Sequence, residues 1–200
     1  MADARPRIEV AAHVRGLVFD CDGTLVDSMP LHMEAWEHAL RRHGGTFDLE
    51  FLMAKAGMSE EGIVALHNAH YGQDLDAGRV VAAKHAHFRR HLRALVPIPA
   101  VAEVAHRHAG VLPMAVVSGS TREIVLRELE AVGLAGLFHA LVTADDPYAP
   151  KPAPDGFLAA ARLLAVPPAL CQAFEDGELG LRAATAAGML ATDVRPFLAS

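Results

Sequence analysis

Short apolar segments alternate with longer amphipathic segments along most of this chain. The first apolar segment, residues 17–19, ends at an aspartate and predicts a buried strand. The later apolar segments predict strands at 114–117, 140–143, 170–174 and 190–194, and the amphipathic segments predict helices at 101–109, 121–132, 154–164 and 178–187. Alternation of strands and helices on this scale predicts an α/β fold with a parallel sheet and helices on both of its faces.

The segment between the first and second predicted strands has a different pattern, without a convincing strand. Helical periodicity is found at 30–43, 49–56, 60–70 and 78–95. This helical segment interrupts the strand–helix alternation. We therefore predict a core domain formed by residues 1–28 and 97–200, and an inserted helical domain formed by residues 29–96.

Composition and charge narrow the possible partners. The 200 residues are 52% hydrophobic, carry a formal net charge of -6 and have their lysines and arginines scattered, which argues against a nucleic-acid partner. No apolar run reaches the length of a membrane span, and the N-terminus has no secretory pattern. Cys21 and Cys171 are too few for a disulfide framework, so we predict free thiols and a cytoplasmic protein. A monomer is our expectation.

An acidic pair, Asp20 and Asp22, stands at the end of the first predicted strand. In an extended chain, residues two positions apart point to the same side, so both carboxylates can face one small volume. Two such carboxylates repel each other unless a cation or a shared proton lies between them. The alternative interpretation is a solvated aspartate turn.

Serines follow the second predicted strand, in the order Ser118, Gly119, Ser120. Ser120 and Glu123 match a capping box, which predicts Ser120 as a helix N-cap. Ser118 then lies at the strand end beside the N–H groups of a helix N-terminus, a position that favours an anion. Taken alone, a serine such as Ser118 is more often an ordinary turn serine.

Further charged residues follow the third and fourth predicted strands. Lys151 lies in a proline-rich loop that fixes the direction of its ammonium group, although such a loop can be a simple surface turn. Glu175 and Asp176 form a second acidic pair, in which Asp176 is also a candidate helix cap. Four carboxylates without an accompanying histidine or cysteine predict Mg²⁺ rather than zinc.

The motifs DCDGTLVDS, SGS, KPAPD and FEDGELGLRAATAAGM, in this order, resemble those of the haloacid dehalogenase superfamily of phosphohydrolases. Within it, the chain resembles the β-phosphoglucomutase-like subfamily, and most of all the small bacterial phosphatases of fructose 1-phosphate. The resemblance implies a Rossmann-like core with an inserted α-helical cap, and hydrolysis of small sugar phosphates through an aspartyl phosphate. A β-phosphoglucomutase, or a catalytically silent binding protein on the same fold, remains as an alternative.

The resemblance also implies a role for each motif residue. Asp20 matches the nucleophile that accepts the phosphoryl group. Asp22 matches the general acid that protonates the departing sugar oxygen and then acts as a base toward water. Ser118 and the Gly119 amide match the groups that hold phosphoryl oxygens, and Lys151 matches the cation that neutralises charge across the site.

The same resemblance implies a Mg²⁺ site. Its ligands would be Asp20, the backbone carbonyl of Asp22, and Asp176, with Glu175 binding directly or through water. This chain has Gly177 where the family usually has serine, so a hydrogen bond that supports the metal ligands is lost and metal affinity is expected to be weaker.

Residues in the helical segment bear on the substrate. By the resemblance, His32 and Lys84 face the site and bind substrate, while Trp36 either faces the site or packs in a core. The loop 57–60 matches the one from which the mutases grip a second phosphate with arginine. Here it ends in Glu60, which would repel a phosphate, so a phosphatase is favoured over a mutase.

His87 and His91 lie four residues apart, with His85 close by, and raise the question of a metal site. Neither a carboxylate nor a cysteine joins them at a matching spacing, and their helix is rich in arginine. We therefore predict a solvated helix face.

Overall fold

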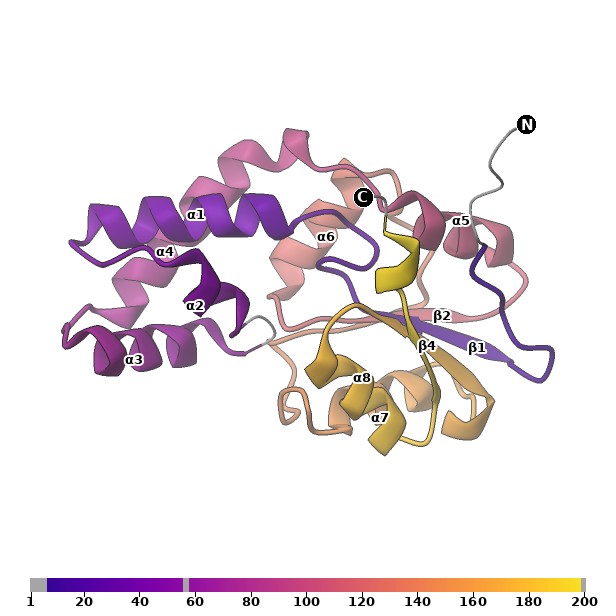
Figure 1. Cartoon of the computed structure of the whole chain (residues 1–200). Coiled ribbons are helices and arrows are strands. Elements are labelled where there is room, and N and C mark those ends of the chain that lie inside the picture. The colour runs from indigo at the N-terminus through magenta and orange to yellow at the C-terminus, as the bar shows by residue number, and fades with distance from the viewer. Residues whose placement is uncertain (1–6, 56–57, 199–200) are drawn as a thin grey trace.

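Five parallel strands form one sheet in a computed structural model that describes residues 7–55 and 58–198 (Figure 1). The sheet order is β3-β2-β1-β4-β5. The strands are β1 (Gly16–Phe19), β2 (Met114–Val117), β3 (Ala140–Val142), β4 (Cys171–Glu175) and β5 (Leu190–Asp193). This arrangement confirms the predicted α/β fold. It places β1 at the centre, hydrogen-bonded to β2 on one side and β4 on the other.

Helices cover both faces of this sheet (Figure 1). They are α5 (Pro99–His108) and α6 (Arg122–Ala131) on one face, and α7 (Asp155–Leu163) and α8 (Glu178–Ala186) on the other. Leu17 and Phe19 of β1 point to the α5–α6 side, and Val18 points to the α7–α8 side. Because both faces of β1 are buried, its sequence is continuously apolar rather than alternating, and each such side chain contributes about 1.5–3 kcal/mol.

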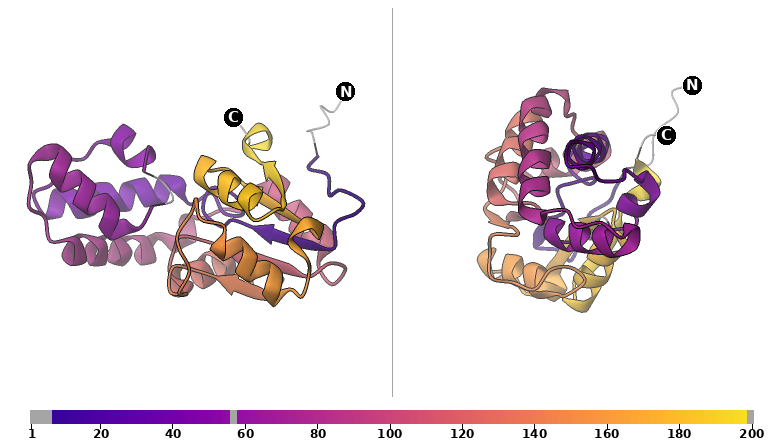
Figure 2. Two further views of the ribbon diagram at one scale, coloured as in Figure 1. Left: turned by 90° about the horizontal axis from the view of Figure 1, so that it is seen from below. Right: turned by 90° about the vertical axis from the view of Figure 1, so that its left-hand side faces the viewer.

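Helices of the inserted segment lie beyond one end of the sheet (Figures 1 and 2). They are α1 (Met29–Arg42), α2 (Leu49–Met53), α3 (Glu60–Tyr71) and α4 (Ala77–His91). Pro30 lies in the first turn of α1, where a missing N–H costs nothing. These helices share an apolar cluster of their own, in which Trp36 is 3% exposed. Trp36 packs in this cluster and also lines the cleft described below, so both interpretations of Trp36 apply.

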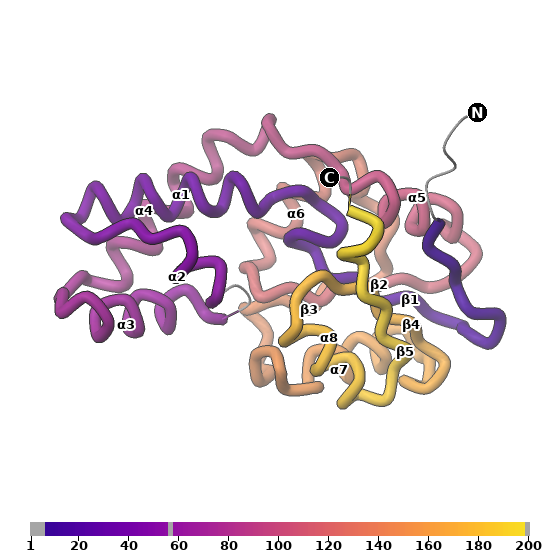
Figure 3. The backbone as a smooth tube through the Cα atoms, viewed as in Figure 1, coloured from indigo at the N-terminus to yellow at the C-terminus, as the bar shows by residue number. Residues whose placement is uncertain are grey.

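Two chain segments connect this helical part to the sheet and lie side by side (Figure 3). The Asp27 N–H donates to the Val96 carbonyl at 3.0 Å, and the Ile98 N–H donates to the Leu25 carbonyl at 2.9 Å. A bridge between Val26 and Pro97 completes the contact. The outgoing and returning segments are thus hydrogen-bonded to each other at the base of the helical part.

The structure differs from the predicted elements mainly at helix ends. The helix predicted at 49–56 ends at Met53, and residue 56 lies outside the described residues. The helix predicted at 78–95 ends at His91 and continues as a short 3₁₀ turn, Leu92–Ala94. Within the described ranges, none of the helices is long and apolar enough to cross a membrane.

Candidate active site

The candidate site lies where the three central strands end. Asp20 follows β1, Ser118 follows β2, and Glu175 is the last residue of β4. Because β1 lies between β2 and β4, these carboxyl ends are neighbours, and the chain order reverses between β1 and β4. Ligands of open α/β sheets bind at such a switch point.

A cleft of about 580 Å³ opens at this edge of the sheet, between the sheet and the helical part. Among the predicted site residues it is lined by Asp20, Asp22, His32, Lys84, Gly119, Lys151, Glu175 and Asp176. A second cavity of about 360 Å³ adjoins it and is lined by Ser118, Gly119 and Lys151. The structure therefore brings all the predicted site residues to one region.

An acidic cluster with one lysine occupies the base of the cleft. Carboxylate oxygens of Asp20, Glu175 and Asp176 lie within 4.8 Å of one another. The Lys151 ammonium donates to Asp20 at 2.6 Å and to Glu175 at 2.5 Å. Burial and the charge of Glu175 raise the pKa of Asp20 to about 7, in spite of Lys151. Burial and the charge of Asp20 raise the pKa of Asp176 to about 6.

The donor set of this cluster fits a magnesium ion. Three carboxylates share one ammonium group, so the ionised cluster has an excess of negative charge that a divalent cation would neutralise. The carboxylates are also oriented, since Thr24 donates its hydroxyl to Asp176 at 2.9 Å and the Gly177 N–H donates to Glu175 at 3.1 Å. Oxygen ligands held in this way are those that Mg²⁺ prefers.

The Asp22 side chain contacts other residues than those of the acidic cluster. Its carboxylate accepts hydrogen bonds from Ser28 at 2.7 Å, His32 at 2.7 Å, Ser120 at 2.9 Å and Ser118 at 3.2 Å. Burial disfavours its ionised form, but the interaction with His32 and these hydrogen bonds outweigh burial and hold the pKa of Asp22 well below its usual range. Asp22 is therefore an ionised carboxylate in this arrangement, and its side chain lies outside the acidic cluster.

The prediction of Ser120 as a helix N-cap is wrong. Helix α6 is preceded by Thr121 at its N-cap, and no side chain caps it. The Ser120 hydroxyl instead donates to Asp22, and its N–H donates to the Ser118 hydroxyl at 3.0 Å. A hydrogen bond to an ionised carboxylate is stronger than a neutral capping bond, so the nearby Asp22 takes the hydroxyl.

His32 and Lys84 form a hydrogen-bonded line that reaches Asp22. The Lys84 ammonium donates to Nδ1 of His32 at 2.9 Å and forms an ion pair with Glu60. An ammonium group can only donate, so Nδ1 is an acceptor, the ring proton sits on Nε2, and Nε2 donates to Asp22. His85 bonds the other Glu60 oxygen at 2.5 Å. Burial favours the protonated form of Glu60, but the hydrogen bonds and charges of His85 and Lys84 outweigh it and lower the pKa of Glu60 to about 2.

The loop that carries Glu60 begins at residue 57, which lies outside the described residues. Glu60 itself is ionised at neutral pH and lines both cavities. Its charge is paired with Lys84 and His85 rather than free.

Glu128 of α6, a fully buried glutamate beside Asp22 and His32, is not among the residues predicted from the sequence. Its Oε2 accepts from the Cys21 thiol at 3.3 Å, and its Oε1 lies 3.6 Å from Nε2 of His32 without a hydrogen-bond partner among the described residues. Burial and the charge of Asp22 raise the pKa of Glu128 to about 8. One signal in the sequence could have indicated this buried carboxylate: Glu128 stands four residues after Ile124, on the apolar face of α6.

Both cysteines, Cys21 and Cys171, are buried free thiols in the part of the chain that the structure describes, as predicted. Burial raises the pKa of the Cys171 thiol to about 11 and that of Cys21 well above its usual range, so neither is a reactive thiolate.

A Rossmann-like sheet with an acidic cluster and a lysine at its carboxyl edge, facing an inserted helical segment, defines a hydrolase of the haloacid dehalogenase type. A model of the haloacid dehalogenase-like hydrolase family matches residues 14–188, and the chain belongs to this family.

Individual relatives refine the comparison. The chain is 40% identical to fructose-1-phosphate phosphatase YqaB of Escherichia coli (strain K12), over 90% of this chain and 96% of that protein. It is 32% identical to validoxylamine A 7'-phosphate phosphatase of Streptomyces hygroscopicus subsp. limoneus, over 86% and 81% of the two chains. The crystal structure of CbbY from Rhodobacter sphaeroides in complex with phosphate has the same fold, with a TM-score of 0.79, 24% identity and coverage of 89% and 84%.

Proposed function

We propose that this chain is a Mg²⁺-dependent phosphatase that hydrolyses small sugar phosphates of the fructose 1-phosphate kind. The observation that carries the proposal is the pairing of Asp20 with Lys151 at 2.6 Å, beside the separately held Asp22. The 40% identity to a fructose-1-phosphate phosphatase over 90% of the chain supports the substrate class. A small sugar phosphate would fit a cleft of about 580 Å³.

In the proposed reaction, an Asp20 oxygen attacks phosphorus and the bond to the sugar oxygen breaks. Asp22, which is ionised in the arrangement described above, first takes up a proton from solvent and then gives it to that oxygen, and the phosphoryl group remains on Asp20 as an aspartyl phosphate. Water then attacks phosphorus, Asp22 takes a proton from the water, and Asp20 and inorganic phosphate are released. Ser118 and the Gly119 amide receive the phosphoryl oxygens, and Lys151 keeps Asp20 and the phosphate close despite their like charge.

A bound Mg²⁺ would neutralise charge between the nucleophile and the phosphoryl group. We propose that Asp20, Asp176 and the Asp22 backbone carbonyl would hold it, with Glu175 binding directly or through water. The requirement is physical, since an anionic nucleophile and an anionic ester repel each other. The single positive charge of Lys151 cannot neutralise both the nucleophile and the ester.

Asp22 must change its contacts to act as the acid. Its carboxylate is ionised and hydrogen-bonded to His32 and three serines, in a group apart from Asp20. We propose that residues 29–96 form a cap whose closure over substrate turns Asp22 toward Asp20 and excludes water from the aspartyl phosphate. His32 and Lys84 of the cap would then contact the substrate.

The test is phosphate release from a panel of sugar phosphates, with and without Mg²⁺, by the wild type and by Asp20→Asn. Asp74→Asn, the same change at an exposed aspartate, is the matched control. Mg²⁺-dependent release that is lost only in Asp20→Asn supports the proposal. Release by Asp20→Asn at the wild-type rate refutes the assigned nucleophile.

The same panel separates the other candidate functions. Conversion of β-glucose 1-phosphate to glucose 6-phosphate, without free phosphate, would mean a mutase in spite of the negative charge of Glu60. A folded protein that turns over none of the substrates would favour a binding protein. A monomeric state and a cytoplasmic location stay predictions.

A further inference from the structure

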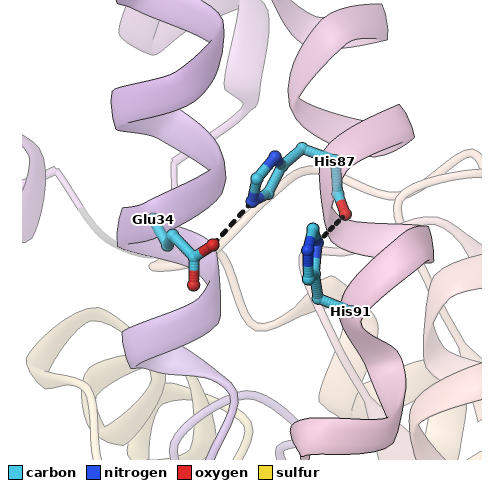
Figure 4. Close-up of side chains that lie close together, drawn as sticks. All are labelled: Glu34, His87 and His91. Atoms are coloured by element: carbon cyan, nitrogen blue, oxygen red, sulfur yellow. Dashed lines mark hydrogen bonds and ion pairs between the residues drawn. The ribbon is translucent and has the colours of Figure 1, made fainter.

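Three metal-ligating side chains meet at the edge between α1 and α4, and none of them lines the two cavities of the candidate active site (Figure 4). They are Glu34 of α1 and His87 and His91 of α4, and their ligand atoms lie within 4.8 Å of one another. The Glu34 side chain is 57% exposed and that of His87 is 13% exposed. The sequence offers no carboxylate at a matching spacing beside the two histidines, because the carboxylate that joins them comes from another helix.

The hydrogen bonds of this cluster orient its ligand atoms. Nδ1 of His91 contacts the His87 backbone carbonyl at 2.9 Å, and a carbonyl only accepts, so the His91 proton sits on Nδ1. Nε2 of His91 therefore carries a free lone pair. Metal-bound histidines are typically held in this way, by a bond from the other ring nitrogen to a backbone carbonyl.

The remaining two ligand atoms already face each other. Nε2 of His87 lies 2.8 Å from Oε1 of Glu34. Two ligands of a tetrahedral zinc ion, each about 2.0 Å from the metal, are about 3.3 Å apart. A small outward movement of the exposed Glu34 carboxylate therefore opens room for an ion, and the proton between the two groups leaves.

We propose that Glu34, His87 and His91 form a second metal site, which binds a divalent transition-metal ion of the zinc class. Two imidazoles and one carboxylate suit Zn²⁺, whereas Mg²⁺ prefers oxygen ligands. The fourth ligand of the ion is then water or His38, whose ring centroid lies 4.4 Å from that of His87. The site is separate from the acidic cluster in both position and ligand chemistry.

Such an ion ties α1 to α4, the two helices that carry His32 and Lys84. These two residues are hydrogen-bonded to each other at 2.9 Å. Zn²⁺ bound at Glu34, His87 and His91 therefore stabilises the pairing of the two helices at a point outside the cleft. This predicts slower hydrogen exchange in α1 and α4 when Zn²⁺ is bound.

The test is a calorimetric titration of the whole chain with Zn²⁺, with Mg²⁺ in excess to occupy the acidic cluster. We expect one Zn²⁺ per chain in the wild type. Glu34→Gln and His91→Gln should each weaken binding at least about tenfold. Zn²⁺ at about one hundred times its dissociation constant should raise the melting temperature of the wild type by about 5 °C or more, and that of Glu34→Gln and His91→Gln by clearly less.

The matched controls are Glu37→Gln, three residues after Glu34 on α1, and His106→Gln at an exposed histidine of α5. Both variants should bind Zn²⁺ as the wild type does. All variants should keep their fold and basal phosphate release, because none of these residues lies in the candidate active site. Two results would overturn the proposal. The first is the absence of stoichiometric Zn²⁺ binding, and the second is equal binding by the wild type, Glu34→Gln and His91→Gln.

Discussion

The raised pKa of Asp20 predicts that the metal-free protein loses stability as the pH rises. The pKa of this carboxyl is raised from 3.8 to about 7, chiefly by burial and by the charge of Glu175. A carboxyl whose pKa is higher in the folded than in the unfolded protein binds its proton more tightly when folded. Stability is therefore greatest at low pH and falls as the pH rises toward the folded-state pKa.

The size of this fall follows from the two pKa values. Integrated between about pH 5 and pH 8, Asp20 alone accounts for about 2–3 kcal/mol of the free energy of unfolding. Asp176, with a pKa raised to about 6, acts in the same direction. For a protein of this size, the fall corresponds to a decrease in melting temperature of about 5–10 °C. The lowered pKa of Glu60, about 2, contributes stability that is lost only below its ordinary value of 4.5.

The assay is urea unfolding in a chelator, at a series of pH values from about 5 to 8. The wild type should lose stability across this range, Asp20→Asn should lose less, and Asp74→Asn should behave as the wild type. Mg²⁺ should restore stability at the upper end of the range, because it binds the ionised cluster of the folded state. A wild-type stability that is constant or rises with pH would refute the reasoning.

Three other predictions concern the contacts of the site and the cap. Ser120→Ala should leave the far-ultraviolet circular dichroism unchanged, because the hydroxyl bonds to Asp22 and does not cap α6; a loss of helix signal would restore the capping interpretation. Gly177→Ser should tighten Mg²⁺ binding up to about tenfold in calorimetry, since a Cβ at Gly177 lies 3.5 Å from Glu175, an ordinary contact. Gly177→Ala is its control, and equal affinities would exclude a role for the hydroxyl. Solution scattering should show compaction with Mg²⁺ and aluminium fluoride, and an unchanged radius of gyration would contradict cap closure.

The strands and the helical insertion could be predicted because each carries a local signal. Buried on both faces, β1 and β2 are continuous apolar runs, and β4 is apolar apart from Gln172 and its last residue, Glu175. The change to helical periodicity after residue 29 is long enough to exclude strands. The order of the strands in the sheet has no comparable local signal. It depends on which helices cross which face, and only the structure shows that β4 pairs with β1 rather than with β3.

The gathering of candidate site residues could be predicted where a residue stands at the end of a strand: Asp20 follows β1, Ser118 follows β2, and Glu175 is the last residue of β4. The predictions failed or were absent where the partner comes from a distant part of the chain. Ser120 has a local capping partner in sequence, yet its hydroxyl bonds to Asp22, 98 residues away. Glu128 likewise meets Cys21 across 107 residues. Spacing along one element cannot reveal such contacts.

One line of hydrogen bonds and ion pairs joins the helical part to Asp22, the proposed acid–base residue. Glu60 pairs with Lys84, Lys84 donates to His32, and His32 donates to Asp22, so that α3, α4, α1 and the loop after β1 each contribute one member. The same Glu60 lines both cavities, with its charge paired to Lys84 and His85. Under the proposed function, the charge that the helical part presents to substrate and the orientation of Asp22 therefore depend on one network. Glu60→Gln would remove the anion that holds the Lys84 ammonium, and it would loosen the bond from Lys84 to His32 and with it the orientation of Asp22.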